Sequence, residues 1–201
     1  MAFINYSNGE VNCKLVYCGP GLSGKTTNIL QVYRSVRPES RGRLVSLYTE
    51  MERTLYFDFL PIDLGLVARF RIRLHLYSVP GQVFYAATRR LVFRGVDGIV
   101  FVADSQIERM DANYEALRDL RMNAAHYGLD IETLPYALQL NKRDLENIHD
   151  VQFLTDELRS AGEPVYQAIA AENEGVRETL KDVARQLLLK LQGELTEVPA
   201  R

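Results

Sequence analysis

Eight residues near the start of the chain have the spacing of a loop that wraps phosphate groups. They match the pattern G-x-x-x-x-G-K-[ST] and read Gly19, Pro20, Gly21, Leu22, Ser23, Gly24, Lys25 and Thr26. Glycines let the backbone approach phosphates closely, so that amide N–H groups point at them. In such a loop the lysine lies beside the β- and γ-phosphates, and the hydroxyl that follows it ligates Mg²⁺. The pattern therefore predicts a nucleotide site.

The sequence on either side of this loop supports the prediction. Residues 11–18 are mostly apolar and read as a strand, and residues 25–36 have a helical period, with Ile29, Val32 and Val36 on one face. A strand, the loop and a helix in this order form the context that the pattern requires. The helix start also adds the positive end of its dipole, and Thr27 at that start is counted with the predicted phosphate site.

A second motif points to the base. Asn141, Lys142 and Asp144 match N-K-x-D and follow a plausible buried strand. Guanine presents two N–H donors on one edge, and the Asp144 carboxylate can accept both, whereas adenine has no such pair. We expect Asn141 to join this loop to the phosphate loop and the Lys142 stem to lie along the base. The backbone N–H of Ala170, after a short strand near 164–169, is a candidate donor to guanine O6.

These motifs are similar to those of Ras-like small GTPases, and among them the chain resembles the bacterial MglA family. The resemblance covers roughly residues 10 to 192 and is also carried by residues 53–61, 79–85 and 94–105. It implies GTP or GDP with Mg²⁺ as cofactors and a homodimeric, MglB-like roadblock protein as activator. It also implies a role in cell polarity and in gliding or pilus-based motility, with recruitment to a cell pole.

Three positions are candidates for the chemistry of GTP hydrolysis, which depends on positioning and on charge stabilisation. Gln82 is expected to orient the attacking water, and the N–H of Gly81 to bind the γ-phosphate. The resemblance implies that Arg53 is an arginine finger supplied by the chain itself. A surface salt bridge between Arg53 and Glu50 or Glu52 is the alternative.

The Mg²⁺ ligands are expected to differ from those of Ras proteins. Thr26 supplies one hydroxyl, and either Thr49 or Thr54 supplies the second, with the resemblance favouring Thr54. Ras proteins read D-x-x-G where this chain has Ser78 followed by Val-Pro-Gly, so the usual carboxylate is missing. Asp58 is a candidate substitute, and its alternative role is to satisfy polar groups within its own segment.

The pattern of elements predicts an α/β protein with a mostly parallel sheet, helices on both faces and one antiparallel edge strand. In the strand at 71–77, apolar and polar residues alternate, which predicts a half-exposed strand near the sheet edge beside 43–48. A single domain is expected over 1–192, with a disordered tail over 193–201. The expected strands are 11–18, 43–48, 71–77, 97–104, 134–141 and 164–169; the expected helices are 25–36, 84–93, 109–127, 151–161 and 175–192.

The composition limits the partners. With a formal net charge of −2 over 201 residues, nothing favours nucleic acid as a partner. No apolar run approaches the ~18 residues of a membrane span, and neither Ala2 nor the last four residues fit a lipidation motif. We therefore expect a cytoplasmic protein without a lipid anchor or membrane span. The charged residues between Glu108 and Arg121 are interpreted as a solvated helix face.

Two functions of different classes fit the sequence. The first is a GTP-hydrolysing molecular switch that binds effector proteins through residues 40–62 and 78–93, with the apolar run 55–61 as a contact surface. The second is a nucleotide-dependent scaffold that hydrolyses GTP negligibly, which the missing carboxylate at Ser78 favours. A third interpretation, an ATP-using kinase, gives no reason for the motif at 141–144.

Overall fold

The computed structural model describes residues 2–48, 54–67, 69–80, 86–160 and 162–196. One sheet with the strand order β3-β4-β5-β2-β6-β7-β8 runs through this part, and β1 pairs with β2. The strands are β1 (Phe3–Asn5), β2 (Glu10–Cys18), β3 (Val45–Tyr48), β4 (Thr54–Val67), β5 (Phe70–Ser78), β6 (Gly98–Asp104), β7 (Tyr136–Asn141) and β8 (Val165–Gln167). The α-helices are α1 (Lys25–Ser35), α2 (Ala86–Phe93), α3 (Met110–His126), α4 (Val151–Leu158) and α5 (Val176–Thr196).

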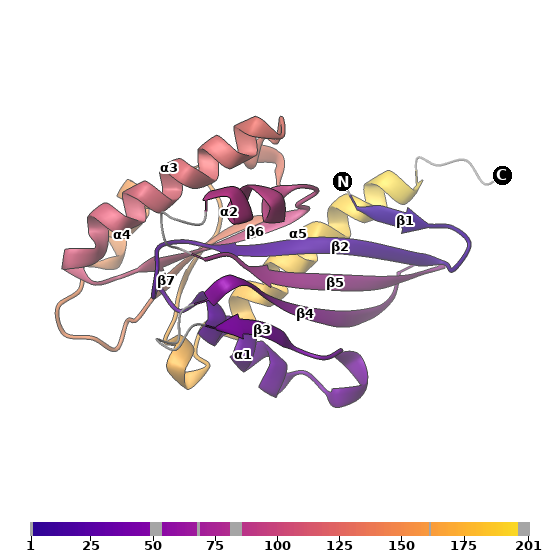
Figure 1. The fold of residues 1–201 in the computed structure, drawn as a ribbon, viewed down its shortest axis with the longest axis horizontal. Helices are drawn as coiled ribbons and strands as arrows, with labels where there is room; N and C mark the ends of the chain where they lie inside the picture. The colour runs from indigo at the N-terminus through magenta and orange to yellow at the C-terminus, as the bar shows by residue number, and fades with distance from the viewer. Residues whose placement is uncertain (1, 49–53, 68, 81–85, 161, 197–201) are drawn as a thin grey trace.

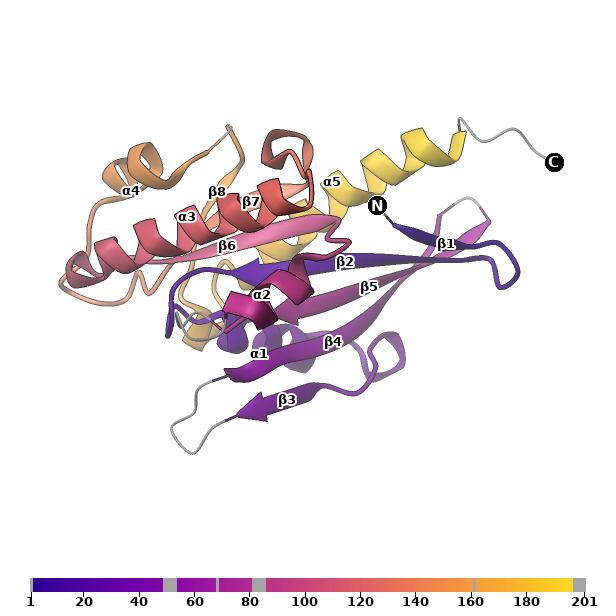
Figure 2. The same cartoon turned by 45° about the horizontal axis from the view of Figure 1, so that its top comes forward.

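Helices cover both faces of this sheet. Figures 1 and 2 show α2, α3 and α4 on one side, and α1 and α5 on the other. Ile29 of α1 and Val183 of α5 belong to one buried apolar cluster, whereas Phe93, Leu117 and Leu154 of the other three helices belong to a second. The apolar stripe of each helix thus packs on the sheet, which keeps the strands in fixed positions.

The central strands run parallel to one another. β2 pairs in parallel with β5 and β6, β6 with β7, and β7 with β8. Their carboxyl ends therefore meet at one edge of the sheet, where open α/β sheets bind ligands. The predicted α/β class and the mostly parallel sheet with helices on both faces are confirmed.

The expected position of the strand at 71–77 is wrong. β4 lies between β3 and β5 and runs antiparallel to both, so β3 forms the edge and the antiparallel strand lies inside the sheet. The alternation within β5 is as predicted, with Ile72, Leu74 and Leu76 buried and Arg71 exposed. β5 is half exposed for a different reason: in Figure 1 no described helix covers the front face of β4 and β5.

Two differences concern the ends of the chain. β1 is a three-residue strand that pairs antiparallel with β2, and it is too short to give a periodic signal in the sequence. α5 continues to Thr196, so residues 193–196 are helical rather than part of a disordered tail. Among the helices of the described ranges, none is both long enough and apolar enough to span a membrane.

Candidate functional site

The phosphate loop connects β2 to α1 and depends on two glycines. Gly19 has φ +134°, and a Cβ at this position would lie 2.2 Å from the carbonyl oxygen of Val102 in β6. Gly24 has φ +98°, and a Cβ there would lie 2.2 Å from Asn141 Nδ2. Any larger residue would push the loop away from the strands on either side, because backbone and a fixed amide cannot give way easily.

Lys25 lies inside this loop. Its side chain is buried, and its Nζ donates to the carbonyl oxygens of Gly19 at 3.1 Å and Pro20 at 2.5 Å. Burial lowers the pKa of the Lys25 ammonium to about 8, since the charged form loses hydration. An anionic phosphate beside Nζ would favour the charged form, so the residue is suited to bind a phosphate.

Asn141 joins three segments that are far apart in the sequence. Its Nδ2 donates to the carbonyl oxygen of Ser23 at 2.7 Å, and its Oδ1 accepts from the backbone N–H of Ala170 at 2.9 Å. The expected tie between the base loop and the phosphate loop is therefore present. The N–H of Ala170 already donates to Asn141 Oδ1. The predicted hydrogen bond from this N–H to guanine O6 would therefore compete with the bond to Asn141.

Lys142 of the N-K-x-D motif binds a buried carboxylate that sequence reasoning missed. Lys142 has a left-handed backbone with φ +67°, and its Nζ donates to Asp104 Oδ2 at 2.6 Å. Asp104 is the last residue of β6, and its place at a strand end was the only signal in the sequence. The Asp144 side chain is exposed at the same edge of the sheet.

Asp58 connects Thr26 to Ser78. The hydroxyl of Thr26 donates to Asp58 Oδ2 at 2.6 Å, and the hydroxyl of Ser78 donates to the same oxygen. The second oxygen, Oδ1, is buried and has no hydrogen-bond partner among the described residues. A buried carboxylate oxygen without a partner is costly, and carboxylate and hydroxyl oxygens are the ligands that Mg²⁺ prefers. This group of side chains fits a Mg²⁺ site.

Several predicted site residues cannot be compared with the structure. Thr49, Arg53, Gly81 and Gln82 lie outside the described residues, and so do Glu50 and Glu52. Thr54 begins β4, where its Cα pairs with that of Tyr48, but only its backbone is described. The roles of these residues stay predictions.

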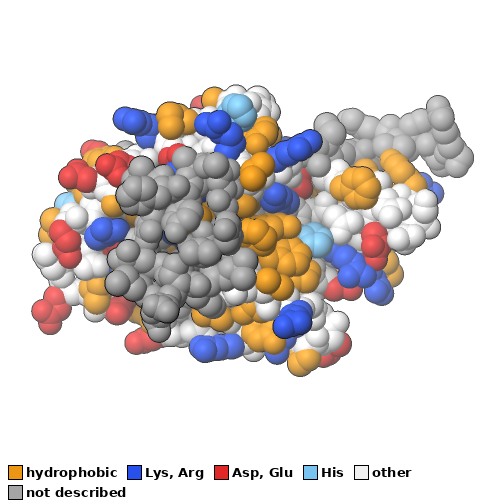
Figure 3. Space-filling view, in the orientation of Figure 1, with side chains coloured by type: hydrophobic (Ala, Val, Ile, Leu, Met, Phe, Trp, Pro, Cys, Tyr) orange, Lys and Arg blue, Asp and Glu red, His pale blue; other side chains and the backbone are white. Residues whose placement is uncertain are grey.

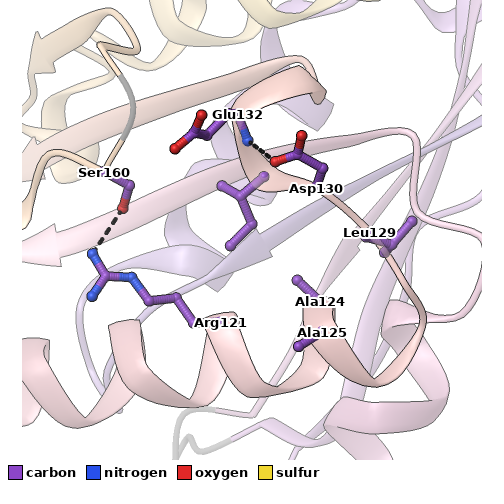
Figure 4. A pocket seen from close by; sticks show the side chains of 8 residues that line it. Arg121, Ala124, Ala125, Leu129, Asp130, Glu132 and Ser160 are labelled. Atoms are coloured by element: carbon purple, nitrogen blue, oxygen red, sulfur yellow. Dashed lines mark hydrogen bonds between the residues drawn. The ribbon is translucent and has the colours of Figure 1, made fainter.

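One cavity among the described residues lies away from the predicted site. A cavity of ≈ 370 Å³ lies between α3 and the short 3-10 helix Ile131–Thr133, on the side of the sheet where β7 begins (Figure 4). None of the predicted nucleotide residues is among those that line it: Arg121, Ala124, Ala125, Leu129, Asp130, Ile131, Glu132 and Ser160.

The parallel sheet, the phosphate loop after β2 and the base loop after β7 define the Ras-like class of nucleotide-binding proteins. The chain is 54% identical over 191 residues to the mutual gliding-motility protein MglA of Myxococcus xanthus (strain DK1622), which covers 95% of this chain and 98% of that protein. No family model matches the chain. Identity at this level over nearly the full length shows that the chain belongs to the MglA family of small GTPases, which bind GTP.

Proposed function

We propose that this protein is a GTP-hydrolysing molecular switch that acts in gliding motility and cell polarity. The contact between Asn141 Nδ2 and the Ser23 carbonyl oxygen carries the proposal, because it brings the base loop against the phosphate loop at one edge of the sheet. A single guanine nucleotide can then contact both loops. The identity to a gliding-motility protein supports the biological role.

In this proposal the residues divide the work between binding and hydrolysis. Lys25 and the loop N–H groups bind the phosphates, and Asp144 accepts from guanine. Gln82 orients the attacking water beside the N–H of Gly81. Arg53 supplies positive charge to the γ-phosphate in the transition state, which is the part of the reaction that an arginine finger accelerates.

Thr26, Thr54 and Asp58 would hold the Mg²⁺ ion. When bound, the ion neutralises charge on the phosphate oxygens. Asp58 compensates for the absence of a carboxylate at Ser78 by reaching the same place from β4. The supporting observation is that Oδ1 of Asp58, next to the Thr26 hydroxyl, has no hydrogen-bond partner within the part of the chain that the structure describes.

We expect Asp58→Asn to lower the Mg²⁺ affinity of the GTP-bound protein by about 10–100-fold, the usual cost of losing a partner near a metal. The amide removes one negative charge and one oxygen ligand. A Mg²⁺ titration with a fluorescent GTP analogue measures the effect. Asp63→Asn is the matched control, because Asp63 lies on the same strand but beside Arg71, 3.7 Å away. Equal titrations for wild type and Asp58→Asn would remove Asp58 from the metal site.

The activator in this proposal is an MglB-like roadblock homodimer, and effectors bind through residues 40–62 and 78–93. A cluster of half-exposed aromatic side chains on the outer face of β4 and β5 is suited to bind a partner protein. Tyr77 lies with its ring centroid 5.0 Å from that of Phe59 and 5.8 Å from that of Phe57. Figure 3 shows hydrophobic side chains gathered on this face. Aromatic side chains are common at the centre of protein interfaces.

The alternative function is a nucleotide-dependent scaffold with negligible hydrolysis, which the serine at position 78 favours. Two measurements separate the proposals. Chromatography of the nucleotide that co-purifies with the chain should identify GDP or GTP. Single-turnover hydrolysis with and without the roadblock protein should then show acceleration by that protein. A guanine nucleotide that stays intact in both reactions would favour the scaffold, and a bound adenine nucleotide would contradict both functions.

A further inference from the structure

The carboxylate of Asp104 lies between two cations at the carboxyl end of β6. Its side chain is fully buried, with Lys142 Nζ at 2.6 Å and Arg109 Nε at 3.8 Å from Oδ2. Asn113 fixes the backbone of Asp104 on both sides, since it accepts from the N–H at 2.9 Å and donates to the carbonyl at 2.8 Å. A buried charge needs such partners, so this carboxylate is a rigid anchor for both cations.

Lys142 is the first side chain that this anchor holds. Its left-handed backbone is uncommon for a residue with a side chain and must be maintained by its surroundings. Its Nζ donates to Asp104 and also to Gln106 Oε1 at 3.0 Å. Asp104 and Gln106 therefore hold the Lys142 ammonium in place, and this contact connects the base loop to the end of β6.

Arg109 is the second side chain that Asp104 holds, and it reaches the phosphate loop. The sequence predicted a solvated face that included Arg109, but the residue stands at the N-cap of α3, and its Nη2 donates to the carbonyl oxygen of Gly21 at 2.8 Å. In a trans peptide the C=O and the next N–H point in opposite directions. Because Arg109 holds the Gly21 carbonyl, the N–H of Leu22 must face away from Arg109.

We propose that Arg109 is a positioning residue that holds the phosphate loop in its nucleotide-binding conformation. Arg109 is also coupled to Lys142 of the base loop, because both side chains contact Asp104. The phosphate loop and the base loop are thus connected twice, directly by Asn141 and indirectly through Arg109, Asp104 and Lys142. The inference rests on the proposed nucleotide site. Its consequence is a longer residence time of the bound nucleotide, because the phosphate loop opens less often.

The test is the dissociation rate of a fluorescent GDP analogue, chased with excess GDP, from the full chain. Arg109→Ala should release the analogue about 10–100-fold faster, as expected for the loss of one charge-assisted hydrogen bond. Arg109→Lys should restore part of the difference, since an ammonium can still donate to the Gly21 carbonyl. Arg118→Ala is the control, because Arg118 is an exposed arginine of the same helix.

Two further measurements distinguish positioning from general damage. The preference for GDP over XDP should stay the same in Arg109→Ala, since the base edge is read by Asp144. The far-ultraviolet circular dichroism spectrum of the variant saturated with GDP should match that of the wild type. Dissociation from Arg109→Ala at the wild-type rate, or failure of Arg109→Lys to recover any of the loss, would overturn the inference. A wild-type chain that binds no GDP would overturn the proposed function and this inference together.

Discussion

Replacement of Arg53 by alanine is expected to slow GTP hydrolysis by about 10³–10⁵-fold, the range in which arginine fingers act. GTP affinity should stay nearly unchanged, because the guanidinium matters more in the transition state than in the ground state. Single-turnover hydrolysis in excess roadblock protein measures the first quantity, and nucleotide titration measures the second. The partner then accelerates the reaction by positioning Arg53 and Gln82 rather than by donating an arginine of its own.

The control for this experiment is Arg185→Ala, which removes an exposed arginine of α5 outside the two proposed contact segments. It should hydrolyse GTP at the wild-type rate, so that a loss in Arg53→Ala cannot be a general effect of charge. Gln82→Leu should be as slow as Arg53→Ala, because the attacking water loses its orienting group. Activated hydrolysis by Arg53→Ala at the rate of the wild type would mean that the finger comes from elsewhere.

The motifs predicted the loops of the site because local sequence determines them. Gly19 and Gly24 are needed where a Cβ would meet Val102 and Asn141, and such demands leave a fixed spacing in the sequence. The tie from Asn141 to the phosphate loop could be expected for the same reason. The parallel sheet followed from alternating strand and helix patterns, which carry a strong periodic signal.

β4 was missed because its two faces look alike in the sequence. Leu60 and Ile62 face the core together with the polar Asp58, whereas the apolar Phe57, Phe59 and Pro61 occupy the outer face, so the usual alternation of apolar inner and polar outer residues is absent. The outer aromatics are accommodated because the neighbouring strand supplies rings for them: the Phe59 ring stacks on His75, with centroids 5.6 Å apart. Pairing across strands of this kind cannot be read from a single segment.

The contacts of single charged side chains were equally hidden. The sequence around Arg109 is typical of a solvated helix face, yet its side chain donates to the carbonyl oxygen of Gly21, 88 positions earlier in the chain. Asp58 was predicted as a candidate substitute for the missing carboxylate, but its contacts with Thr26 and Ser78 depend on the pairing of β4 with β5. Both results depend on the order of strands in the sheet, which brings together residues that no local pattern relates.

Asp144→Asn is expected to change the preferred base. The carboxylate can accept from two guanine donors, and each charge-assisted bond contributes roughly 1.5–3 kcal/mol. Loss of both corresponds to an affinity for GDP that is about 10²–10⁴-fold weaker. The asparagine amide would place a donor opposite the guanine amino group, whereas xanthine offers a carbonyl oxygen there. XDP should therefore bind the variant more tightly than it binds the wild type.

Competition of GDP and XDP against a fluorescent nucleotide measures this change, and Glu146→Gln controls for the loss of a negative charge. Glu146 is exposed in the same loop two positions later, and its replacement should leave the preference for GDP intact. The Asn141 contact to the phosphate loop does not involve position 144, so Asp144→Asn should retain the fold and the phosphate site. An Asp144→Asn protein that still prefers GDP over XDP would show that another group reads the base, and the guanine assignment of this loop would then be wrong.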